Sequence, residues 1–203
     1  GRLRIGLLDH HPFGGPVHEQ CTLAVRNAAS LLESLGHDIE PGFPSSLANP
    51  DFARRFIALW STNMGASFAR VEDQVGRPLQ PGDVEPVNWA QAEFGRSVNG
   101  VEYALALAAN VEFRRATQQW WTEGWDLLLS PTLGEPPVRL GEFANDPANP
   151  MSPLLRGSSY VLFTPAFNSS GQPAINLPLH WTPDGLPVGI QLVAAYGRED
   201  MLL

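Results

Sequence analysis

The chain has 203 residues, of which 43% are hydrophobic, and its formal net charge is −8. This length and composition suffice for one domain with a real core and exclude a disordered chain. The acidic balance argues against nucleic-acid binding through a basic surface. The chain has no apolar run of 18 or more residues and no charged-then-apolar amino terminus, so we expect neither a membrane span nor a signal peptide.

The first forty residues predict a βαβ-like unit. Residues 2–8 have the pattern of a strand, a helix is expected over 16–35 with Pro16 at its first position, and residues 37–40 begin a second strand. A βαβ unit favours an α/β fold, here a mixed β-sheet covered by helices. Cys21 is the only cysteine. It falls on the apolar face of the predicted helix, which favours a buried, inert thiol. A single cysteine forms no internal disulfide, which is typical of a protein in a reducing compartment.

The middle of the chain predicts two long helices and a buried strand. One helix is capped by Asp51 and ends at Gly76, and the other begins near Asn99 and stops at Gly124. The strand covers residues 125–129. The following elements are also expected from the sequence: an apolar stripe on the first of these helices formed by Phe52, Phe56, Leu59, Trp60, Met64, Phe68, Val71 and Val75; a loop over 77–86; core packing of Trp120 and Trp121; and a long irregular stretch over 133–158.

Residues 167–192 predict a loop that leads into a β-hairpin. Residues 168–171 read as a loop in which Gly171 suits the left-handed conformation. The strand over 174–181 should place Ile175, Leu177, Leu179 and Trp181 on one face. Pro178 lacks an N–H, so this strand should lie at an edge or carry an irregularity. Thr182-Pro-Asp-Gly185 is a turn, and Val188, Ile190 and Leu192 mark the returning strand.

The order of residues around this hairpin resembles the carboxy-terminal half of the amidase signature family. Two segments carry the resemblance: Phe167-Asn-Ser-Ser-Gly-Gln-Pro-Ala174 and Asp184-Gly-Leu-Pro-Val-Gly-Ile-Gln-Leu192. The resemblance is supported by the run Asp126-Leu-Leu-Leu-Ser-Pro-Thr132, by the opening strand with Pro16-Val17-His18, and by the segment Leu31-Leu-Glu-Ser-Leu-Gly-His37 at the end of the first helix. The resemblance covers nearly the whole chain. It implies one domain over residues 1–203 that is a fragment of a larger amidase domain.

Enzymes of this family hydrolyse amides with two serines and a lysine, which the resemblance places upstream of this region. All 13 basic residues of the chain are Arg. Without a lysine the chain cannot supply the neutral amine that takes the proton of the nucleophile, and an arginine stays protonated. We therefore expect no catalytic residue here. The resemblance suggests Phe163, Thr164, Phe167 and Asn168, with the Asp9–Phe13 loop, as substrate-binding residues; ordinary packing or turn formation is the alternative for each.

Other chemistries fit the sequence poorly. The cluster Asp9-His10-His11 with His18 matches no common zinc spacing, and a solvated or pocket-lining loop is the better interpretation. We therefore expect no metal and no cofactor. No Gly-x-Ser-x-Gly segment supports a Ser-His-Asp triad. Gly157-Ser158-Ser159 resembles the start of a serine-rich signature, but Tyr160 follows, and we interpret it as a helix amino terminus. Ser169-Ser170-Gly171 is interpreted as part of a loop rather than as a nucleophile.

Three functions remain open. The first is the carboxy-terminal portion of a cytoplasmic amidase, nearest to bacterial broad-specificity amidases, including the nylon-oligomer type. Its expected partners are a small-molecule amide substrate and the missing amino-terminal half, and its exposed apolar surface would favour a homo-oligomer. The second is the A subunit of a glutamine-dependent tRNA amidotransferase, which the absence of a carboxylate at Tyr160, Val161 and Leu162 disfavours. The third is a non-catalytic binding module.

Overall fold

The computed structural model describes all 203 residues, which group into two compact units. The first unit comprises Gly1–Pro50, Glu112–Val138 and Ser159–Leu203; the second comprises Asp51–Val111 and Arg139–Ser158. None of the helices has the length and apolar character needed to cross a membrane.

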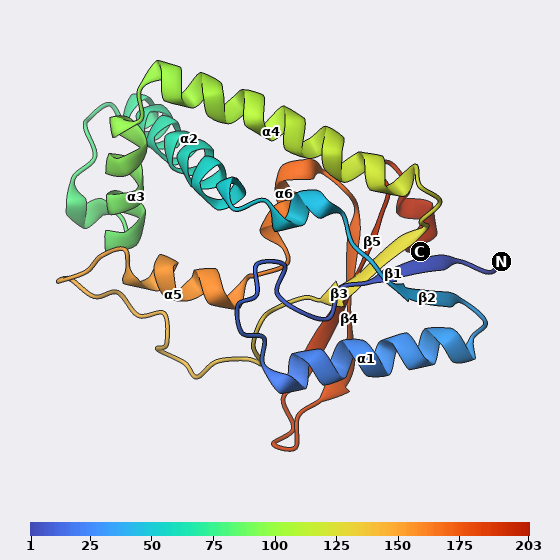
Figure 1. The fold of residues 1–203 in the computed structure, drawn as a ribbon. Helices are drawn as coiled ribbons and strands as arrows, with labels where there is room; N and C mark the ends of the chain where they lie inside the picture. The colour runs from blue at the N-terminus through green and yellow to red at the C-terminus, as the bar shows by residue number, and fades with distance from the viewer. The chain divides into compact units, whose positions relative to one another are not determined.

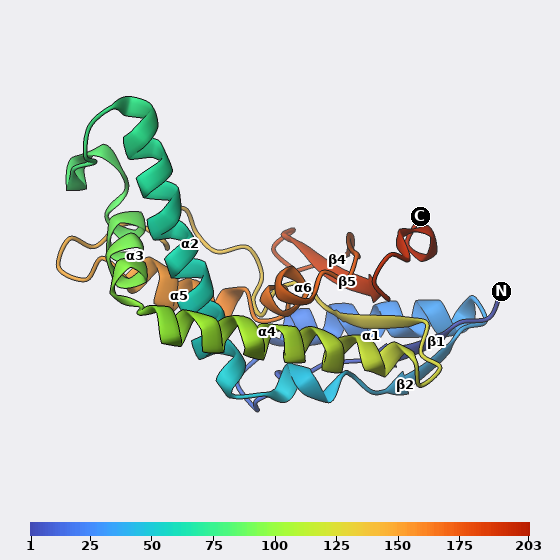
Figure 2. The same cartoon turned by 90° about the horizontal axis from the view of Figure 1, so that it is seen from above.

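The first unit is built on a five-stranded mixed sheet in the order β2-β1-β3-β5-β4. Its strands are β1 (Arg4–Leu7), β2 (Asp38–Pro41), β3 (Leu127–Pro131), β4 (Ala174–Trp181) and β5 (Pro187–Ala194). β1 pairs in parallel with β2 and β3, whereas β5 is antiparallel to both β3 and β4. Figures 1 and 2 show β4 and β5 at one margin of the sheet and β1 and β2 at the other. The predicted mixed α/β sheet is confirmed.

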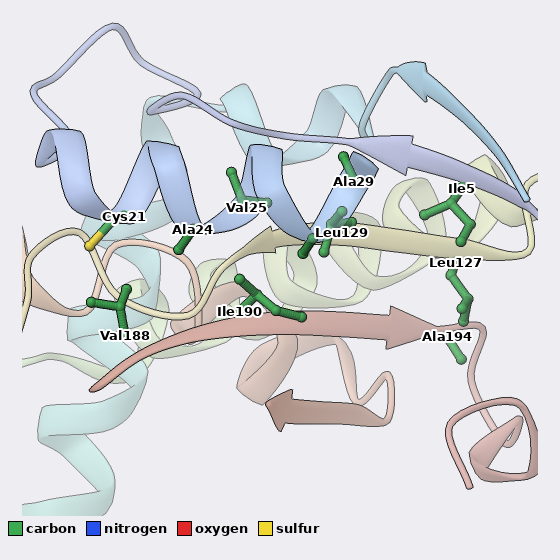
Figure 3. Close-up of a cluster of buried hydrophobic side chains, with 11 residues drawn as sticks. Ile5, Cys21, Ala24, Val25, Ala29, Leu127, Leu129, Val188, Ile190 and Ala194 are labelled. Carbon is green, nitrogen blue, oxygen red and sulfur yellow. The ribbon is translucent and has the colours of Figure 1, made fainter. Parts of the chain in front are cut away.

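Helix α1 (Glu19–Ser34) covers one face of this sheet. Cys21, Ala24 and Val25 pack against strand residues such as Leu129 and Ile190, and all five side chains are buried (Figure 3). The predicted start at Pro16 is wrong, because His18 caps the helix: its Nδ1 accepts a hydrogen bond from the Gln20 N–H at 3.1 Å. A side-chain cap places the first turn after the capping residue.

The carboxyl end of helix α4 (Gly100–Trp121) lies on the opposite face (Figure 1). A Cβ on Gly6 of β1 would lie 2.6 Å from the Trp120 ring, so the indole packs directly on the strand backbone. Trp120 also stacks on Trp125, with ring centroids 4.9 Å apart. Trp120 and Trp121 are both buried, which confirms their predicted role in the core. The first unit therefore has helices on both faces of its sheet.

The β4–β5 hairpin has the predicted turn and edge position. Gly185 has a φ of 79°, and its N–H donates to the Thr182 carbonyl oxygen at 2.9 Å. The pairing register shifts between Leu177 and His180, around Pro178, as expected for a residue without an N–H. The shift changes the face of the residues after it. Leu179 and Trp181, predicted to share a face with Ile175 and Leu177, are exposed, and His180 instead bonds Gln20 of α1 through its Nε2 at 3.0 Å.

The second unit is helical. It contains α2 (Asp51–Val75), a 3-10 turn η2 (Pro81–Asp83), α3 (Pro86–Ser97) and the amino-terminal half of α4. Helices α2 and α3 approach closely at Gly95, which has no side chain. A Cβ there would lie 1.8 Å from the Ser61 carbonyl oxygen. The predicted stripe on α2 is partly wrong. Phe68 is buried, but Trp60, Val71 and Val75 are exposed, and the residues that lie inside with Phe68 are small: Ala58, Ser61 and Gly65.

The remaining elements are short. Helix α5 (Ser152–Tyr160) begins within the 133–158 stretch expected to be irregular, and η1 (Ser45–Ala48) and η3 (Glu199–Met201) are single turns. Helix α6 (Pro165–Ser170) contains Asn168, which was predicted in a loop; the helix continues to Ser170, and Gly171 ends it with a φ of 82°. Helix α4 begins as predicted, because Asn99 Oδ1 accepts from the Glu102 N–H at 3.0 Å.

Candidate functional site

Two loops of the first unit and the carboxyl end of α5 are joined where the parallel strands β1 and β3 end. The His18 N–H donates to the Gly134 carbonyl oxygen at 2.9 Å, and the Gly134 N–H donates to the Tyr160 carbonyl oxygen at 2.8 Å. Only glycine fits at this junction, since a Cβ on Gly134 would lie 2.6 Å from the Ser159 carbonyl oxygen. Ligands of α/β sheets bind beyond the carboxyl ends of the strands, so this edge is the candidate site.

The four predicted substrate-binding residues lie at and beside the start of α6, in two different environments. Phe163 and Phe167 are buried, at 3% and 6% exposure. Thr164 occupies the N-cap position of α6 and is half-buried, and its carbonyl oxygen accepts from the Phe167 N–H at 3.1 Å. Asn168 is exposed. The two phenylalanines are therefore core residues within this chain, and the polar groups of Thr164 and Asn168 are the accessible ones. Their assignment to a substrate site stays a prediction.

The Asp9–Phe13 loop is organised by its own polar side chains. The Asp9 carboxylate accepts from Arg26 Nε at 2.9 Å and lies 3.1 Å from His10 Nδ1. Partial burial would raise the pKa of Asp9, but hydrogen bonds from His10 and Arg26 outweigh it and hold the pKa below the usual value. His11 Nδ1 accepts from the Phe13 N–H at 2.9 Å. Burial lowers the pKa of His11 and favours the neutral ring that this hydrogen bond requires.

The histidines of the first twenty residues thus each have a local task. His10 also contacts the Phe43 ring edge-on, with centroids 5.6 Å apart, and His18 caps α1. The structure brings no three His, Cys, Asp or Glu side chains together in a metal-binding arrangement. The contacts of His10, His11 and His18 support the interpretation of this segment as a solvated or pocket-lining loop.

The two serine pairs occupy helix ends. Gly157-Ser158-Ser159 was expected at a helix amino terminus, but it lies in the carboxyl half of α5, where the Ser158 hydroxyl donates to the Leu155 carbonyl oxygen at 2.7 Å. The helix begins earlier, at Ser152, and Pro153 stands in its first turn, where proline is tolerated. The Ser170 hydroxyl likewise donates to the Ala166 carbonyl oxygen of its own helix, at 2.9 Å. Ser158 and Ser170 thus satisfy the backbone of their own helices, as helical serines commonly do.

The sequence interpretation missed a set of polar side chains on the sheet, here called the polar row: Ser130, Thr132, Asn176 and Gln191. Asn176 and Ser130 are the direct cross-strand partners of Gln191. Gln191 Nε2 donates to Ser130 Oγ at 3.4 Å, and Thr132 Oγ1 donates to Asn176 Oδ1. Part of the signal was available, because Ser130, Asn176 and Gln191 each alternate with apolar residues along their strands. Which of them pair across the sheet follows only from the strand register.

Comparison with known proteins agrees with this architecture. The chain belongs to the amidase family, whose model matches residues 1–203. It is 36% identical over 209 residues to a 6-aminohexanoate-cyclic-dimer hydrolase of Pseudomonas sp. (strain NK87), covering 100% of this chain and 42% of that protein. A hydrolase of the same description from Paenarthrobacter ureafaciens shows the same identity and coverage.

Solved structures show the same relation. The structure of a 6-aminohexanoate cyclic dimer hydrolase matches with a TM-score of 0.90 at 36% identity, over 100% of this chain and 43% of that one. A bacterial aryl acylamidase of the amidase signature family matches with a TM-score of 0.73 at 19% identity, over 99% of this chain and 41% of that one, and shares the fold. The chain spans about 42% of the length of its curated relatives, as their carboxy-terminal portion. These relatives do not favour the tRNA amidotransferase alternative.

Proposed function

We propose that the full-length protein is an amidase that hydrolyses a small carboxamide through an acyl-enzyme. This chain supplies part of the sheet and one wall of the substrate cleft, with Phe163, Thr164, Phe167 and Asn168 in that wall. The observation that carries the proposal is the 36% identity along the whole chain to two hydrolases of the 6-aminohexanoate cyclic dimer. Residues 1–203 are proposed as a fragment of one larger amidase domain.

The chemistry of the chain agrees with this division of labour. In acyl-enzyme hydrolysis, a serine hydroxyl attacks the amide carbonyl carbon, the amine leaves with a proton, and water then hydrolyses the ester. A neutral base must take the hydroxyl proton first. The 13 basic residues here are Arg, whose guanidinium stays protonated, so the proposed Ser-Ser-Lys group is contributed by the amino-terminal portion.

The partners and compartment follow from the same features. The proposed partners are the amide substrate and the amino-terminal portion of the same enzyme, without nucleic acid or membrane, and the enzyme is proposed to be bacterial and cytoplasmic. The net charge of −8 supports the absence of a nucleic-acid partner. The single cysteine, buried and unpaired, is compatible with a reducing compartment.

The test is an assay of the full-length enzyme. We expect it to release 4-nitroaniline from 4-nitroacetanilide or to open the cyclic dimer of 6-aminohexanoate. A variant that lacks the upstream lysine serves as the control and should be inactive. An intact full-length protein that hydrolyses no carboxamide would contradict the proposal. Robust hydrolysis of glutamine, with ammonia as the product, would instead favour the amidotransferase subunit.

A further inference from the structure

The polar row runs from the interior of the first unit's sheet to its exposed edge strand. Ser130 on β3 is 0% exposed and Gln191 on β5 is 5% exposed, whereas Asn176 on β4 is exposed to solvent. The three residues are cross-strand partners, so their side chains share one face, the face opposite α1. Buried polar groups cost free energy unless they are hydrogen-bonded, and an apolar row would be the simpler way to fill a sheet interior.

The side chain of Asn176 is held in one orientation. Its Oδ1 accepts from the Thr132 hydroxyl, and the Thr132 N–H donates to the Gly189 carbonyl oxygen at 3.3 Å. Gly189 leaves the necessary space, because a Cβ there would lie 2.1 Å from Asn176 Oδ1. With Oδ1 occupied, the Nδ2 group is the free end of the amide, and it forms no hydrogen bond within this chain. A donor with two N–H groups is thus fixed at the surface of the sheet.

The Nδ2 group of Asn176 lies close to the carboxyl end of β3, where the candidate site is, because Asn176 bonds Thr132. Thr132 directly follows Pro131, the last residue of β3, and the next residues of that loop bond the segments around His18 and Tyr160. Ligands of such sheets bind beyond the carboxyl ends of the strands. Side-chain amides of asparagine are suited to a carbonyl oxygen, in the ground state or as charge develops on it.

We propose that Asn176 is a substrate-binding residue whose Nδ2 donates to the carbonyl oxygen of a carboxamide, and that Thr132 and Gly189 position it. The proposal rests on the proposed amidase function and adds a specific recognition contact to it. Gln191 and Ser130 extend the same row into the core and fix the strand β5 beside Asn176.

The experiment compares KM and kcat of full-length variants with 4-nitroacetanilide. Asn176→Asp keeps the shape of the side chain but presents oxygen atoms that repel a carbonyl oxygen, and Asn176→Ala removes the donor. Each should raise KM about 3- to 10-fold, the range of one neutral hydrogen bond. Gly189→Ala should reproduce the rise with the amide still present, because the methyl group displaces it.

Two further variants separate positioning from folding. Thr132→Val loses the hydroxyl that holds Asn176 Oδ1 and should raise KM. Thr132→Ser keeps a hydroxyl at this position, so its KM should stay at the value of the parent enzyme. Leu179→Thr is the matched control, since Leu179 is exposed on the same strand and lies outside the polar row; its KM should equal that of the parent. Thermal unfolding of each variant checks that the fold is retained.

The outcomes distinguish this proposal from the proposed function. If Asn176→Asp leaves KM unchanged in an active enzyme, the contact does not exist, and a loss of thermal stability alone would assign Asn176 to the interface with the amino-terminal portion. Calorimetric titration with benzamide measures binding independently of turnover. Weaker benzamide binding by Asn176→Asp, even in a protein without amidase activity, would support the contact while refuting the proposed function.

Discussion

Cys21 lies on the inner face of α1 at 1% exposure, within the core cluster that includes Val188 and Ile190. Burial, with a smaller effect from the charge of Glu135, raises the pKa of its thiol to about 11. We expect Cys21 to resist 5,5′-dithiobis(2-nitrobenzoate) at pH 8 in the folded protein and to react fully in guanidinium chloride. The rate of colour formation measures this. Rapid labelling without denaturant would contradict the packing of α1.

His11 carries a pH-dependent contribution to stability. Burial, with a smaller effect from the charge of His10, lowers its pKa from the ordinary value of 6.5. Above pH 6.5 the ring is neutral in both the folded and the unfolded chain, so the contribution is fully present. As the pH falls through 6.5 toward the folded pKa, the unfolded chain binds the proton first, and stability is lost.

The test of His11 is a titration of its ring by NMR and of unfolding by urea. We expect an apparent pKa below 6.5 and a fall in the free energy of unfolding on acidification below pH 6.5. His11→Asn keeps an acceptor for the Phe13 N–H two residues on, as asparagine does in turns, but does not titrate. It should flatten that part of the pH profile. An unchanged profile in this variant would show that other groups cause the loss.

The contact between α2 and α3 depends on a glycine at the point of closest approach. A Cβ on Gly95 would lie 1.8 Å from the Ser61 carbonyl oxygen, and backbone atoms cannot give way cheaply. We expect Gly95→Ala to lower the free energy of unfolding by about 1–3 kcal/mol, the usual cost of overpacking. Urea unfolding followed by circular dichroism measures the change.

Gly157 provides the control for that substitution. It lies inside α5, and a Cβ there would meet no atom within 4 Å. Gly157→Ala should therefore be neutral or stabilising by up to about 1 kcal/mol, through helix propensity alone. Equal destabilisation by the two substitutions would show that the α2–α3 contact does not decide the effect at Gly95.

Local signals predicted most of the elements, and the misses have physical causes. The turn at Thr182–Gly185, the cap at Asn99 and the irregularity at Pro178 depend on chemistry within a few residues, and all three are present. Helix α3 was not predicted. Its buried residues are Gln91, Ala92 and Gly95, and Trp89 is the large apolar side chain of α3 that packs with them, against Phe68. One large apolar residue among small and polar ones makes no helical stripe in the sequence.

The candidate site was harder to predict than the fold. The sequence placed Phe163 and Phe167 at a substrate wall, yet both rings are buried within this chain, and residue type alone does not distinguish a pocket lining from a core. The polar row depends on the register of β3, β4 and β5, which joins residues up to 61 positions apart. Such a pairing is set by the assembled sheet and is not visible in any local window.

At the scale of the whole molecule, the composition predicts the behaviour of residues 1–203 expressed alone. The chain folds into the scaffold of an amidase, but all 13 of its basic residues are Arg, and a guanidinium cannot act as the neutral base of a Ser-Ser-Lys mechanism. We expect no hydrolysis of 4-nitroacetanilide by this chain, at any pH between 6 and 9. Circular dichroism confirms that the inactive sample is folded.

The control for this prediction is reconstitution with the amino-terminal portion of the same enzyme, expressed separately. Catalysis depends on groups from both portions if the division of labour proposed above is correct, so the mixture should hydrolyse the anilide while each part alone does not. Apolar side chains such as Val101, Leu105 and Trp181 are more than half exposed in the isolated chain, so it should self-associate, which light scattering detects. Turnover by the isolated chain that survives repurification would refute the assignment of the catalytic groups to the amino-terminal portion.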